Sequence, residues 1–365
     1  MSARRPTRVI VGLSGGVDSA VAALCLQRAG YRVEGLFMKN WEDDDVDGRC
    51  AAAADLEDAK AVCERLAIPL HKVNFAAEYR ERVFARFLDE HRAGRTPNPD
   101  VLCNSEIKFR AFLEHARRLG AERIATGHYA RLERAEGRVR LLQGADTNKD
   151  QSYFLHALTQ AQLEHVLFPL GELTKPQVRR IARESGLPNH AKKDSTGLCF
   201  IGERNFREFL KRYLPSEPGD ICAPDGTRLG IHQGLAYYTL GQRRGLGLGG
   251  RADAEPTPWY VVDKDLARNR LVVAQGHDHS LLHTRALETG PAHWIGAAPR
   301  TPFACEARVR YRQPAQPCTI VAAGAATTRV RFDTPQRAVT PGQFAVFYRD
   351  SECLGGGVIE RPLAK

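Results

Sequence analysis

The sequence lacks any apolar run close to the length that a bilayer-spanning helix requires. The apolar segment that follows Arg4 and Arg5 is only about five residues long, shorter than the roughly 7–15 residues of a signal-peptide core. Internal repeats and low-complexity tracts are also missing. These absences predict a cytoplasmic chain, and a length of 365 residues predicts two or three domains.

Paired cysteine spacing is missing as well. Nine cysteines are present, but no two of them form a C-x-x-C arrangement. This pattern excludes a zinc ribbon and a secreted disulfide framework, so the cysteines are predicted to be thiols in a reducing compartment. Cys25, Cys63, Cys305 and Cys318 fall within predicted helices or strands and are expected to fill hydrophobic cores.

Positive charge exceeds negative charge, with 53 Lys and Arg against 43 Asp and Glu and a net charge of +10. This balance admits a polyanionic partner such as nucleic acid, although a generally basic proteome explains it equally well. The hydrophobic fraction of 43% and the charged fraction of 26% are typical of a soluble protein.

The first part of the chain alternates predicted strands with predicted helices, which favours βαβ units and a parallel sheet covered on both faces. Ligands bind such sheets at the carboxyl ends of the strands, where the following loops meet. The predicted strands span 8–13, 31–39 and 70–75, and residues 123–132 are predicted as a fourth strand that runs into a loop. The predicted helices span 18–29, 51–66 and 78–94. The loops after the strands, 14–19, 38–45 and 126–130, are expected to meet at one edge of the sheet.

The pattern changes in the second half. Two short basic helices are predicted over 173–187 and 205–214, and glycine-rich sequence with short strands follows from about residue 216. After about residue 280, alternating strands divided by Pro and Gly indicate a small β-barrel. The predicted domains are residues 1–204, 205–279 and 280–365.

Residues 14–19, Ser-Gly-Gly-Val-Asp-Ser, form a small loop between an apolar strand and an amphipathic helix. Its backbone N–H groups and the positive end of the helix dipole favour phosphate. Ser14 and Ser19 add hydroxyl donors, and Asp18 is predicted to cap the helix. The loop has neither the lysine of a Walker loop nor the spacing of G-x-G-x-x-G. A tight turn with a good N-cap is the alternative reading.

The S-G-G-x-D-S pattern resembles the pyrophosphate loop of the ATP-pyrophosphatases. These enzymes activate an oxygen by AMP transfer and release pyrophosphate. The resemblance implies that the loop holds the phosphates of ATP, but it does not identify the group that is adenylated.

Two cysteines stand in loops rather than in regular elements. Cys103 lies in the Pro- and Asn-containing segment 94–109, at a predicted turn before a helix, and a helix N-terminus lowers the pKa of a thiol. Cys199 lies in the small-residue segment 192–203, near Lys192 and Lys193. Both are candidate reactive thiols, and a structural role is the alternative for each.

Nine motifs occur in order along nearly the whole chain: GLSGGVDSA, FMKNW, TPNPDVLCN, ATGHYAR, NKDQSYFL, STGLCFIGE, LGQRRGLGLGG, RVRYRQ and TPGQFAVFY. Each is weak alone, but together they resemble the bacterial tRNA-specific 2-thiouridylases. The resemblance implies a Rossmann-like (adenine nucleotide alpha hydrolase-like) parallel sheet with a small central domain and a C-terminal β-barrel. It also implies that sulfur replaces the 2-oxygen of the wobble uridine (U34) of tRNA.

In this reaction ATP converts the carbonyl oxygen into an adenylate that leaves as AMP, with Mg²⁺ expected on the phosphates. By resemblance, Cys199 carries a persulfide received from a sulfur-relay protein. Cys103 is then the nucleophile that attacks the bridging persulfide sulfur and leaves a transient Cys103–Cys199 disulfide. Alternatively, the terminal sulfur is lost first as hydrosulfide, which then attacks the activated carbon. Asp100 is a candidate general acid or base, or a turn residue after Pro99.

The resemblance assigns further roles residue by residue, and none of the assigned residues is a metal ligand. It assigns ATP binding to Gly12, Leu13, Ser14, Gly15, Gly16, Val17, Asp18, Ser19, Met38 and Gly127. It assigns tRNA contacts to Asn98, Pro99, Asp100, His128, Lys149, Asp150, Gln151, Tyr311, Arg312 and Gln343.

Arg308, Arg310 and Arg312 alternate with Val309 and Tyr311 in the predicted barrel. On one strand they would place three guanidinium groups on one face, a possible track for RNA phosphates. Solvated arginines on an exposed strand are the alternative.

Other functions remain open on sequence grounds. A related ATP-pyrophosphatase could adenylate a small molecule or a different tRNA position, although the chain has no ammonia-supplying segment. A nucleic-acid-binding protein without turnover is the alternative from another class, and the intact loop and both cysteines argue against it. Release of pyrophosphate from ATP, with and without tRNA, separates these functions.

Overall fold

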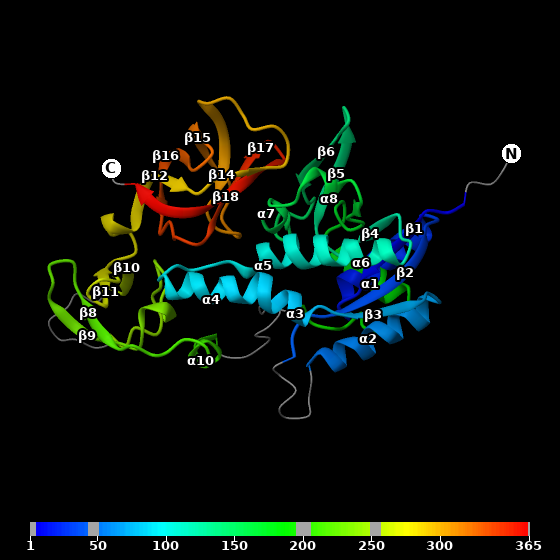
Figure 1. The fold of residues 1–365 in the computed structure, drawn as a ribbon, viewed down its shortest axis with the longest axis horizontal. Helices are drawn as coiled ribbons and strands as arrows, with labels where there is room; N and C mark the ends of the chain where they lie inside the picture. The colour runs from blue at the N-terminus through cyan, green and yellow to red at the C-terminus, as the bar shows by residue number, and fades with distance from the viewer. Residues whose placement is uncertain (1–4, 43–50, 195–205, 249–256, 364–365) are drawn as a thin grey trace.

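The computed structural model describes residues 5–42, 51–194, 206–248 and 257–363 and contains three sheets (Figure 1). The first sheet is parallel, has the order β3-β2-β1-β4-β7, and carries helices on its faces. Val9, Ile10 and Val11 are fully buried, as expected for a parallel strand covered on both sides. This sheet confirms the predicted α/β class. Its elements begin with β1 (Arg8–Gly12), α1 (Val17–Arg28), β2 (Arg32–Lys39), α2 (Ala51–Leu66) and β3 (Leu70–Asn74).

Two long helical runs follow β3. The first consists of α3 (Ala76–Tyr79), a π-helical stretch (Arg80–Phe84) and α4 (Ala85–Arg92). The second consists of α5 (Pro99–Leu102), a π-helical stretch (Cys103–Ala111) and α6 (Phe112–Arg118). Residues 93–98 connect the two runs.

The predicted fourth strand and the loop after it, near residues 126–130, are present, but the hairpin that follows was not predicted. β4 (Arg123–Ala125) ends after three residues, and the chain then turns before β5 (Ala130–Ala135), which forms an antiparallel hairpin with β6 (Arg138–Gln143). The hairpin leaves the parallel sheet because β6 pairs instead with the C-terminal strand β18. The rest of this part consists of α7 (Ser152–Leu155), α8 (Gln160–Leu163), β7 (Val166–Leu167), α9 (Lys175–Glu184) and α10 (Phe206–Lys211).

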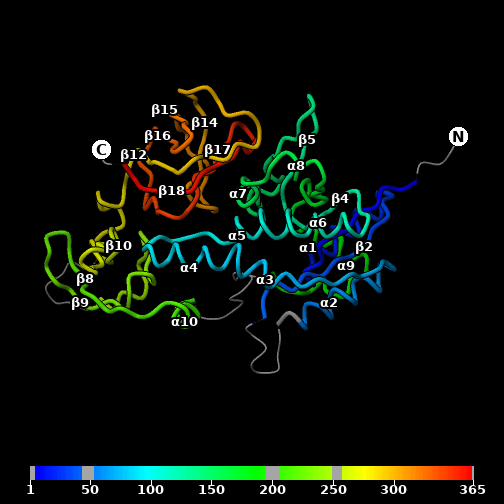
Figure 2. The backbone as a smooth tube through the Cα atoms, viewed as in Figure 1, coloured from blue at the N-terminus to red at the C-terminus, as the bar shows by residue number. Residues whose placement is uncertain are grey.

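A four-stranded sheet of order β10-β11-β8-β9 forms the centre of the chain. The last part is a barrel, because β12 pairs with both β16 and β18 and so closes the strand order β12-β16-β15-β14-β17-β18. Figure 2 traces the path from the parallel sheet through the central sheet to the barrel. The bounds are β8 (Gly219–Cys222), β9 (Arg228–His232), β10 (Trp259–Asp265), β11 (Arg270–Gln275), β12 (His283–Thr289), β13 (His293–Trp294), β14 (Phe303–Arg308), β15 (Gln316–Ala323), β16 (Thr328–Arg337), β17 (Phe344–Arg349) and β18 (Glu352–Leu363).

These sheets bear out the predicted class of a parallel α/β sheet, a small central domain and a C-terminal barrel. The exact domain boundaries stay a prediction. Among the described residues, no helix is long and apolar enough to cross a membrane.

A buried carboxylate ties the first three strands together. Glu34 of β2 is 2% exposed. It accepts two hydrogen bonds of 2.8 Å from the Arg8 guanidinium of β1 and lies 2.8 Å from His71 Nε2 of β3. The bonds from Arg8 lower the pKa of Glu34 to about 2 against the opposing effect of burial, and His71 adds to the lowering.

We expect Glu34→Gln to destabilise the fold in a pH-dependent way. Because the folded pKa lies below the unfolded one, the stabilisation is complete above roughly pH 4.5 and is lost as the pH falls toward 2. The substitution should reduce the free energy of unfolding by about 3 kcal/mol at pH 7. Urea unfolding at several pH values measures this difference, with the exposed Glu57→Gln as the control. A difference that stays constant down to pH 2 would contradict the assignment.

Candidate active site

The loop 14–19 joins the carboxyl end of β1 to the N-terminus of α1, as predicted. Gly15 has a φ of +75°, and a Cβ atom there would lie 2.5 Å from the carbonyl oxygen of Asp55, so only glycine fits. Gly16 is the N-cap residue of α1, and no side chain caps this helix. Ser19 Oγ donates to the Gly16 carbonyl over 3.0 Å and closes the loop. The helix N-terminus therefore keeps its positive end open toward an anion.

The prediction that Asp18 caps α1 is wrong. Both of its carboxylate oxygens bind Lys175 Nζ, at 2.7 and 2.9 Å, and Tyr129 OH donates to Oδ1 over 2.8 Å. The side chain turns away from the helix amides because a buried ammonium, 8% exposed, lies within its reach. Burial, followed by the charge of Asp18, raises the pKa of Tyr129.

Lys175 is a site residue that sequence reasoning missed. It opens α9, whose Thr174 and Gln177 form a capping box. The sequence of the capping box predicts that a helix starts there. It does not predict that the fold brings Lys175 to the loop 14–19. Lys175 Nζ also lies 2.8 Å from Asp194 Oδ1.

Asp194 joins the loop to the segment that carries Cys199. Burial opposes its ionisation, but hydrogen bonds from Lys149 and Lys175 lower the pKa of Asp194 to about 2. Lys149 is a predicted tRNA contact, and its ammonium lies 2.8 Å from Asp194 Oδ2. Cys199 itself, and with it the predicted disulfide to Cys103, lies outside the described residues.

The other predicted ATP residues border the loop. A Cβ atom on Gly12 would lie 3.2 Å from Met38 Cε, so Met38 is next to the start of the loop. A Cβ atom on Gly127 would lie 2.8 Å from both the Asp18 carbonyl carbon and the Ser19 amide nitrogen. The fold therefore brings these predicted ATP residues together. In the described part of the chain, no group of three or more His, Cys, Asp or Glu side chains could hold a metal ion.

Asn98, Pro99 and Asp100 begin the second helical run. Asn98 is the N-cap of α5 and its Oδ1 accepts from the Asp100 amide over 3.2 Å, while Pro99 takes the first helical position. Burial raises the pKa of Asp100, and the charge of Lys108 opposes the rise. A carboxyl group with a raised pKa suits proton transfer near neutral pH.

Cys103 does not lie at a turn before a helix, as its sequence context predicts. It lies one turn into the helical run that begins at Pro99, and it is only 1% exposed. The correction has a local cause, because the Asn98 cap and Pro99 start the helix earlier than the polar sequence indicates. The thiol therefore packs within the core rather than at the positive end of the helix.

Among the predicted tRNA contacts, two polar side chains are buried. Asp150, 3% exposed, accepts from the Gly144 and Ser152 amides, the Ser152 hydroxyl and Arg308 Nη1. His128, 7% exposed, lies 2.7 Å from Thr126 Oγ1 through Nδ1, and burial lowers its pKa well below the usual value. In this structure both bond to protein rather than facing solvent.

The remaining predicted tRNA contacts divide between two places. Gln151 accepts from the Tyr129 amide beside the loop. Tyr311 packs against Phe154 with ring centroids 4.3 Å apart, and Arg312 is exposed. Burial, with the charges of Asp150 and Asp100 adding to it, raises the pKa of Tyr311. Gln343 donates to the Thr96 carbonyl over 2.8 Å.

The predicted arginine track is wrong, because β14 ends at Arg308. Arg308 is an ion-pair partner of Asp150 at 2.8 Å, with a side chain only 13% exposed. Arg310 lies in the turn beyond the strand and donates to the Leu240 and Ala338 carbonyls. Only Arg312 of the three is solvent-exposed, so the strand presents no row of guanidinium groups to RNA.

Known families match this chain along most of its length. A family model described as tRNA methyl transferase HUP domain matches residues 7–203. Models described as tRNA methyl transferase PRC-barrel domain and Aminomethyltransferase beta-barrel domain match residues 207–275 and 284–359.

Curated relatives match over the full length. The tRNA-specific 2-thiouridylase MnmA of Alkalilimnicola ehrlichii is 61% identical over 355 residues, covering 97% of each chain. The MnmA protein of Psychromonas ingrahamii is 58% identical over 367 residues and covers 100% of each chain. That of Escherichia coli O6:K15:H31 is 60% identical over 358 residues, covering 98% of this chain and 97% of its own. The chain belongs to the family of tRNA-specific 2-thiouridylases.

Proposed function

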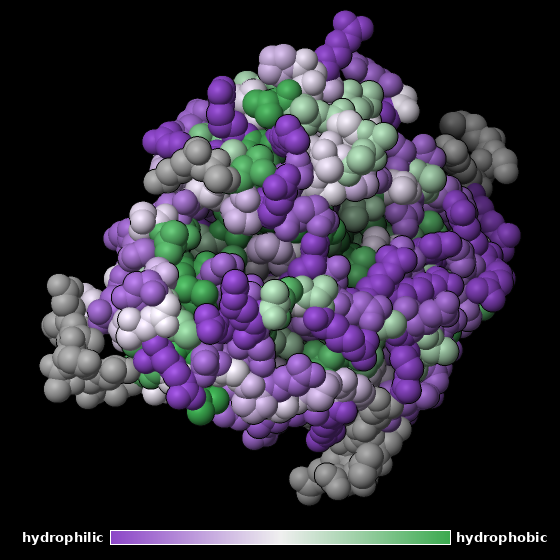
Figure 3. All heavy atoms as spheres, turned by 60° about the vertical axis from the view of Figure 1, so that its left-hand side comes forward, coloured by the Kyte–Doolittle hydropathy of each residue, from purple (hydrophilic) through white to green (hydrophobic). Residues whose placement is uncertain are grey.

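We propose that this protein is a cytoplasmic tRNA-uridine 2-sulfurtransferase that uses ATP to replace the 2-oxygen of the wobble uridine (U34) with sulfur. The observation that carries the proposal is the 61% identity to a tRNA-specific 2-thiouridylase over 97% of both chains. The open helix N-terminus after the loop 14–19 and the partly buried Asp100, three residues before Cys103, support the proposal. Figure 3 shows that hydrophilic side chains cover most of one face of the molecule, and the net charge of +10 suits an RNA substrate.

The first half of the reaction activates the uridine. The open N-terminus of α1 and the loop amides bind the phosphates of ATP, next to Met38 and Gly127 on the adenosine side. The uridine 2-oxygen attacks the α-phosphate, pyrophosphate leaves, and an adenylate forms. Asp100 accepts or returns the proton of the uracil ring. Magnesium, bound mainly through the phosphates, would offset their negative charge.

The second half delivers sulfur. The terminal sulfur of a persulfide on Cys199, received from a sulfur-relay protein, attacks the activated carbon and AMP departs. Cys103 then attacks the Cys199 sulfur, which breaks the S–S bond, leaves the sulfur on the base and forms a Cys103–Cys199 disulfide. If hydrosulfide leaves first, the same disulfide forms before the attack on carbon. An external reductant restores both thiols.

Each of the two reactive cysteines should be essential for sulfur transfer. We expect Cys103→Ser and Cys199→Ser to lower 2-thiouridine formation by at least about 100-fold. The assay is mass spectrometry of nucleosides from unmodified tRNA incubated with protein, MgATP and a persulfide donor. Cys25→Ser, in α1 and half-buried, is the matched control and should keep full activity. Full activity of Cys199→Ser would refute the proposed sulfur chemistry.

A second prediction follows from the close packing of Gly127 against the loop 14–19. A Cβ atom at 2.8 Å from the Asp18 and Ser19 backbone must displace the loop, so Gly127→Ala should weaken ATP binding by about 10-fold or more. Calorimetric titration with ATP measures the dissociation constant. Gly324→Ala is the control, because the nearest atom to its Cβ is an ordinary contact at 3.5 Å. Equal affinities of the two variants would remove Gly127 from the nucleotide site.

The same assays separate the alternatives. Release of pyrophosphate that does not depend on tRNA would indicate a small-molecule substrate. Binding of tRNA without any pyrophosphate release would indicate a binding protein. Sulfur at another uridine position appears directly as a different thiolated nucleoside.

A further inference from the structure

Residues 94–96, which lead from α4 into α5, are held from outside the first domain. Lys264 of β10 donates to the Gly94 carbonyl over 2.9 Å, and burial lowers the pKa of Lys264 to about 8. Arg95 binds the Glu360 carboxylate of β18 and donates to the Ile359 carbonyl. Residues 94–96 therefore form hydrogen bonds or ion pairs with both the central sheet and the barrel.

Thr96 is held most completely. Its amide donates to the Pro341 carbonyl over 2.9 Å, its carbonyl accepts from Gln343 Nε2 over 2.8 Å, and its hydroxyl lies 3.2 Å from the Thr239 hydroxyl. Every polar group of Thr96 thus has its partner in the central part or the barrel, and none in the helices on either side of it.

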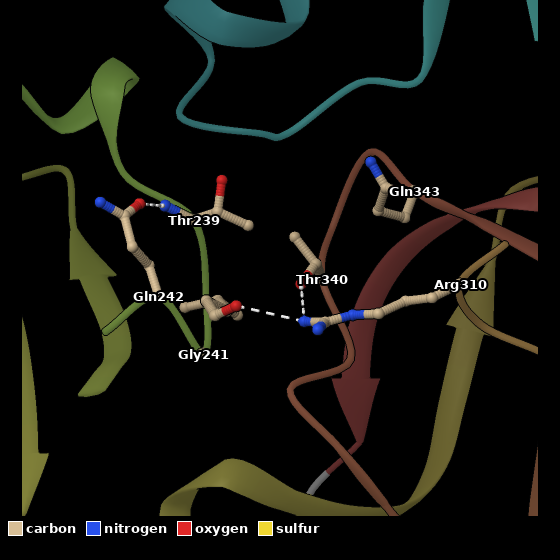
Figure 4. A pocket seen from close by; sticks show the side chains of 7 residues that line it. Thr239, Gly241, Gln242, Arg310, Thr340 and Gln343 are labelled. Carbon is tan, nitrogen blue, oxygen red and sulfur yellow. Dashed lines mark hydrogen bonds between the residues drawn. The ribbon is translucent and has the colours of Figure 1, made fainter. Parts of the chain in front are cut away.

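Gly342 of the barrel lies directly against the backbone of Thr96. Its φ is +91°, and a Cβ atom there would lie 2.9 Å from the Thr96 nitrogen and carbonyl carbon and 3.0 Å from its oxygen. A cavity of about 390 Å³ lies beside this contact, and Thr239, Arg310, Thr340 and Gln343 line it (Figure 4). The barrel backbone therefore touches the Thr96 backbone with no room for a side chain between them.

Thr96 stands two residues before the Asn98 cap, four before Asp100 and seven before Cys103. Only Pro97 separates Thr96 from the Asn98 cap, and its ring restricts the backbone. We therefore expect a shift of Thr96 to move the carboxyl group and the thiol together. Misplacement of a reacting group by about 1 Å can cost about 100-fold in rate.

We propose that Thr96 is a positioning residue through which the central domain and the barrel set the place of Asp100 and Cys103. Gln343 contributes to this positioning because its side chain donates a hydrogen bond to the Thr96 carbonyl. The family resemblance implies instead that Gln343 contacts RNA. The inference rests on the proposed function. It adds that the central domain and the barrel both contact the backbone segment that directly precedes the reacting groups.

A pair of matched glycines tests the proposal. Gly342→Ala and Gly276→Ala place alanine at nearly equal φ values, +91° and +90°, but only at Gly342 does the new Cβ meet Thr96, since nothing lies within 4 Å at Gly276. We expect Gly342→Ala to lower kcat for 2-thiouridine formation about 10- to 100-fold, with the Kd for tRNA within about twofold of wild type. Gly276→Ala should keep the wild-type kcat. Equal kcat values for the two variants would overturn the proposal.

Gln343→Ala provides the second test. A positioning role predicts a reduced kcat at saturating tRNA with an unchanged Kd, whereas a weaker Kd with an unchanged kcat would make Gln343 an RNA contact and overturn its role here. Hydrogen exchange of the amides of Asn98 and of residues 100–103 gives a readout independent of sulfur transfer, since Pro97 and Pro99 have no amide hydrogen. Exchange should be faster in Gly342→Ala than in Gly276→Ala. Equal exchange rates would refute the positioning role of Thr96. If the wild-type protein forms no 2-thiouridine, the proposed function fails. The exchange data then still show whether Thr96 holds the start of α5 in place.

A separate observation concerns two thiols in the barrel. Cys305 of β14 and Cys318 of β15 stand directly opposite each other in an antiparallel pair, with their sulfur atoms 3.7 Å apart. Opposed residues in such a pair have Cα atoms about 4.5–5.5 Å apart, within the range of about 4.4–6.8 Å that a disulfide accepts. Cys318 is buried and Cys305 is partly exposed, so a small oxidant reaches Cys305 first.

We infer that this pair is an oxidation site that peroxide converts to a cross-strand disulfide. Cys305 loses two electrons to hydrogen peroxide, which forms a sulfenic acid and releases one water. The Cys318 sulfur then displaces the hydroxyl group, its proton leaves with it as a second water, and the S–S bond forms. The hydrogen bond to Cys305, followed by burial, raises the pKa of Cys318, in keeping with Cys305 as the thiol that reacts first.

Mass spectrometry of peroxide-treated protein, alkylated and digested without reductant, tests this inference. We expect a linked peptide containing Cys305 and Cys318 that is lighter by two hydrogen atoms, and none in Cys318→Ser, where Cys305 should be overoxidised instead. Recovery of both residues as alkylated thiols, at a peroxide dose that oxidises Cys25, would overturn it.

Discussion

The arrangement of the domains depends on a buried ion pair between Asp150 and Arg308. The Asp150 side chain is 1% exposed and lies 2.8 Å from Arg308 Nη1, whose guanidinium lies 4.8 Å above the Tyr348 ring. Burying both charges is costly, but the amides and the hydroxyl that also bind Asp150 satisfy its remaining acceptor sites. Together with the pairing of β6 and β18, this contact attaches the barrel to the first domain. Only with the barrel in this place does Gln343 reach Thr96.

The two halves of the candidate site are stabilised differently. The loop 14–19 is built locally, since a positive φ at Gly15 and the Ser19 hydrogen bond close it between adjacent elements. The helix that carries Asp100 also starts locally, at the Asn98 cap. The place of that helix, in contrast, is determined by contacts from distant parts of the chain. A local loop beside a remotely positioned helix suits a reaction in which a large substrate bridges several domains.

The charged side chains near the loop are paired with one another in this structure. Lys175 contacts both Asp18 and Asp194, and Asp194 in turn holds Lys149 and Arg179. Under the proposed function, a triphosphate meets ammonium groups that are oriented by carboxylates rather than free to move. Such an oriented cation loses little side-chain entropy when it binds phosphate. The same carboxylates limit the net positive potential of the site, so the backbone amides of the loop become the main recognition element.

The sequence by itself determined the elements whose cause is local. Residues 51–66 were predicted as a helix with its observed bounds, and the loop 14–19 with its flanking strand and helix, because periodicity and glycine conformation act over a few residues. Tertiary structure alone decided the partner of Asp18, the pairing of β6 with β18, and the burial of Asp150 among residues far along the chain. It also placed Thr96 against the barrel. The physical reason is that a side chain's charge or hydrogen-bonding group is readable from sequence, but its partner is selected by packing between segments that no local pattern connects.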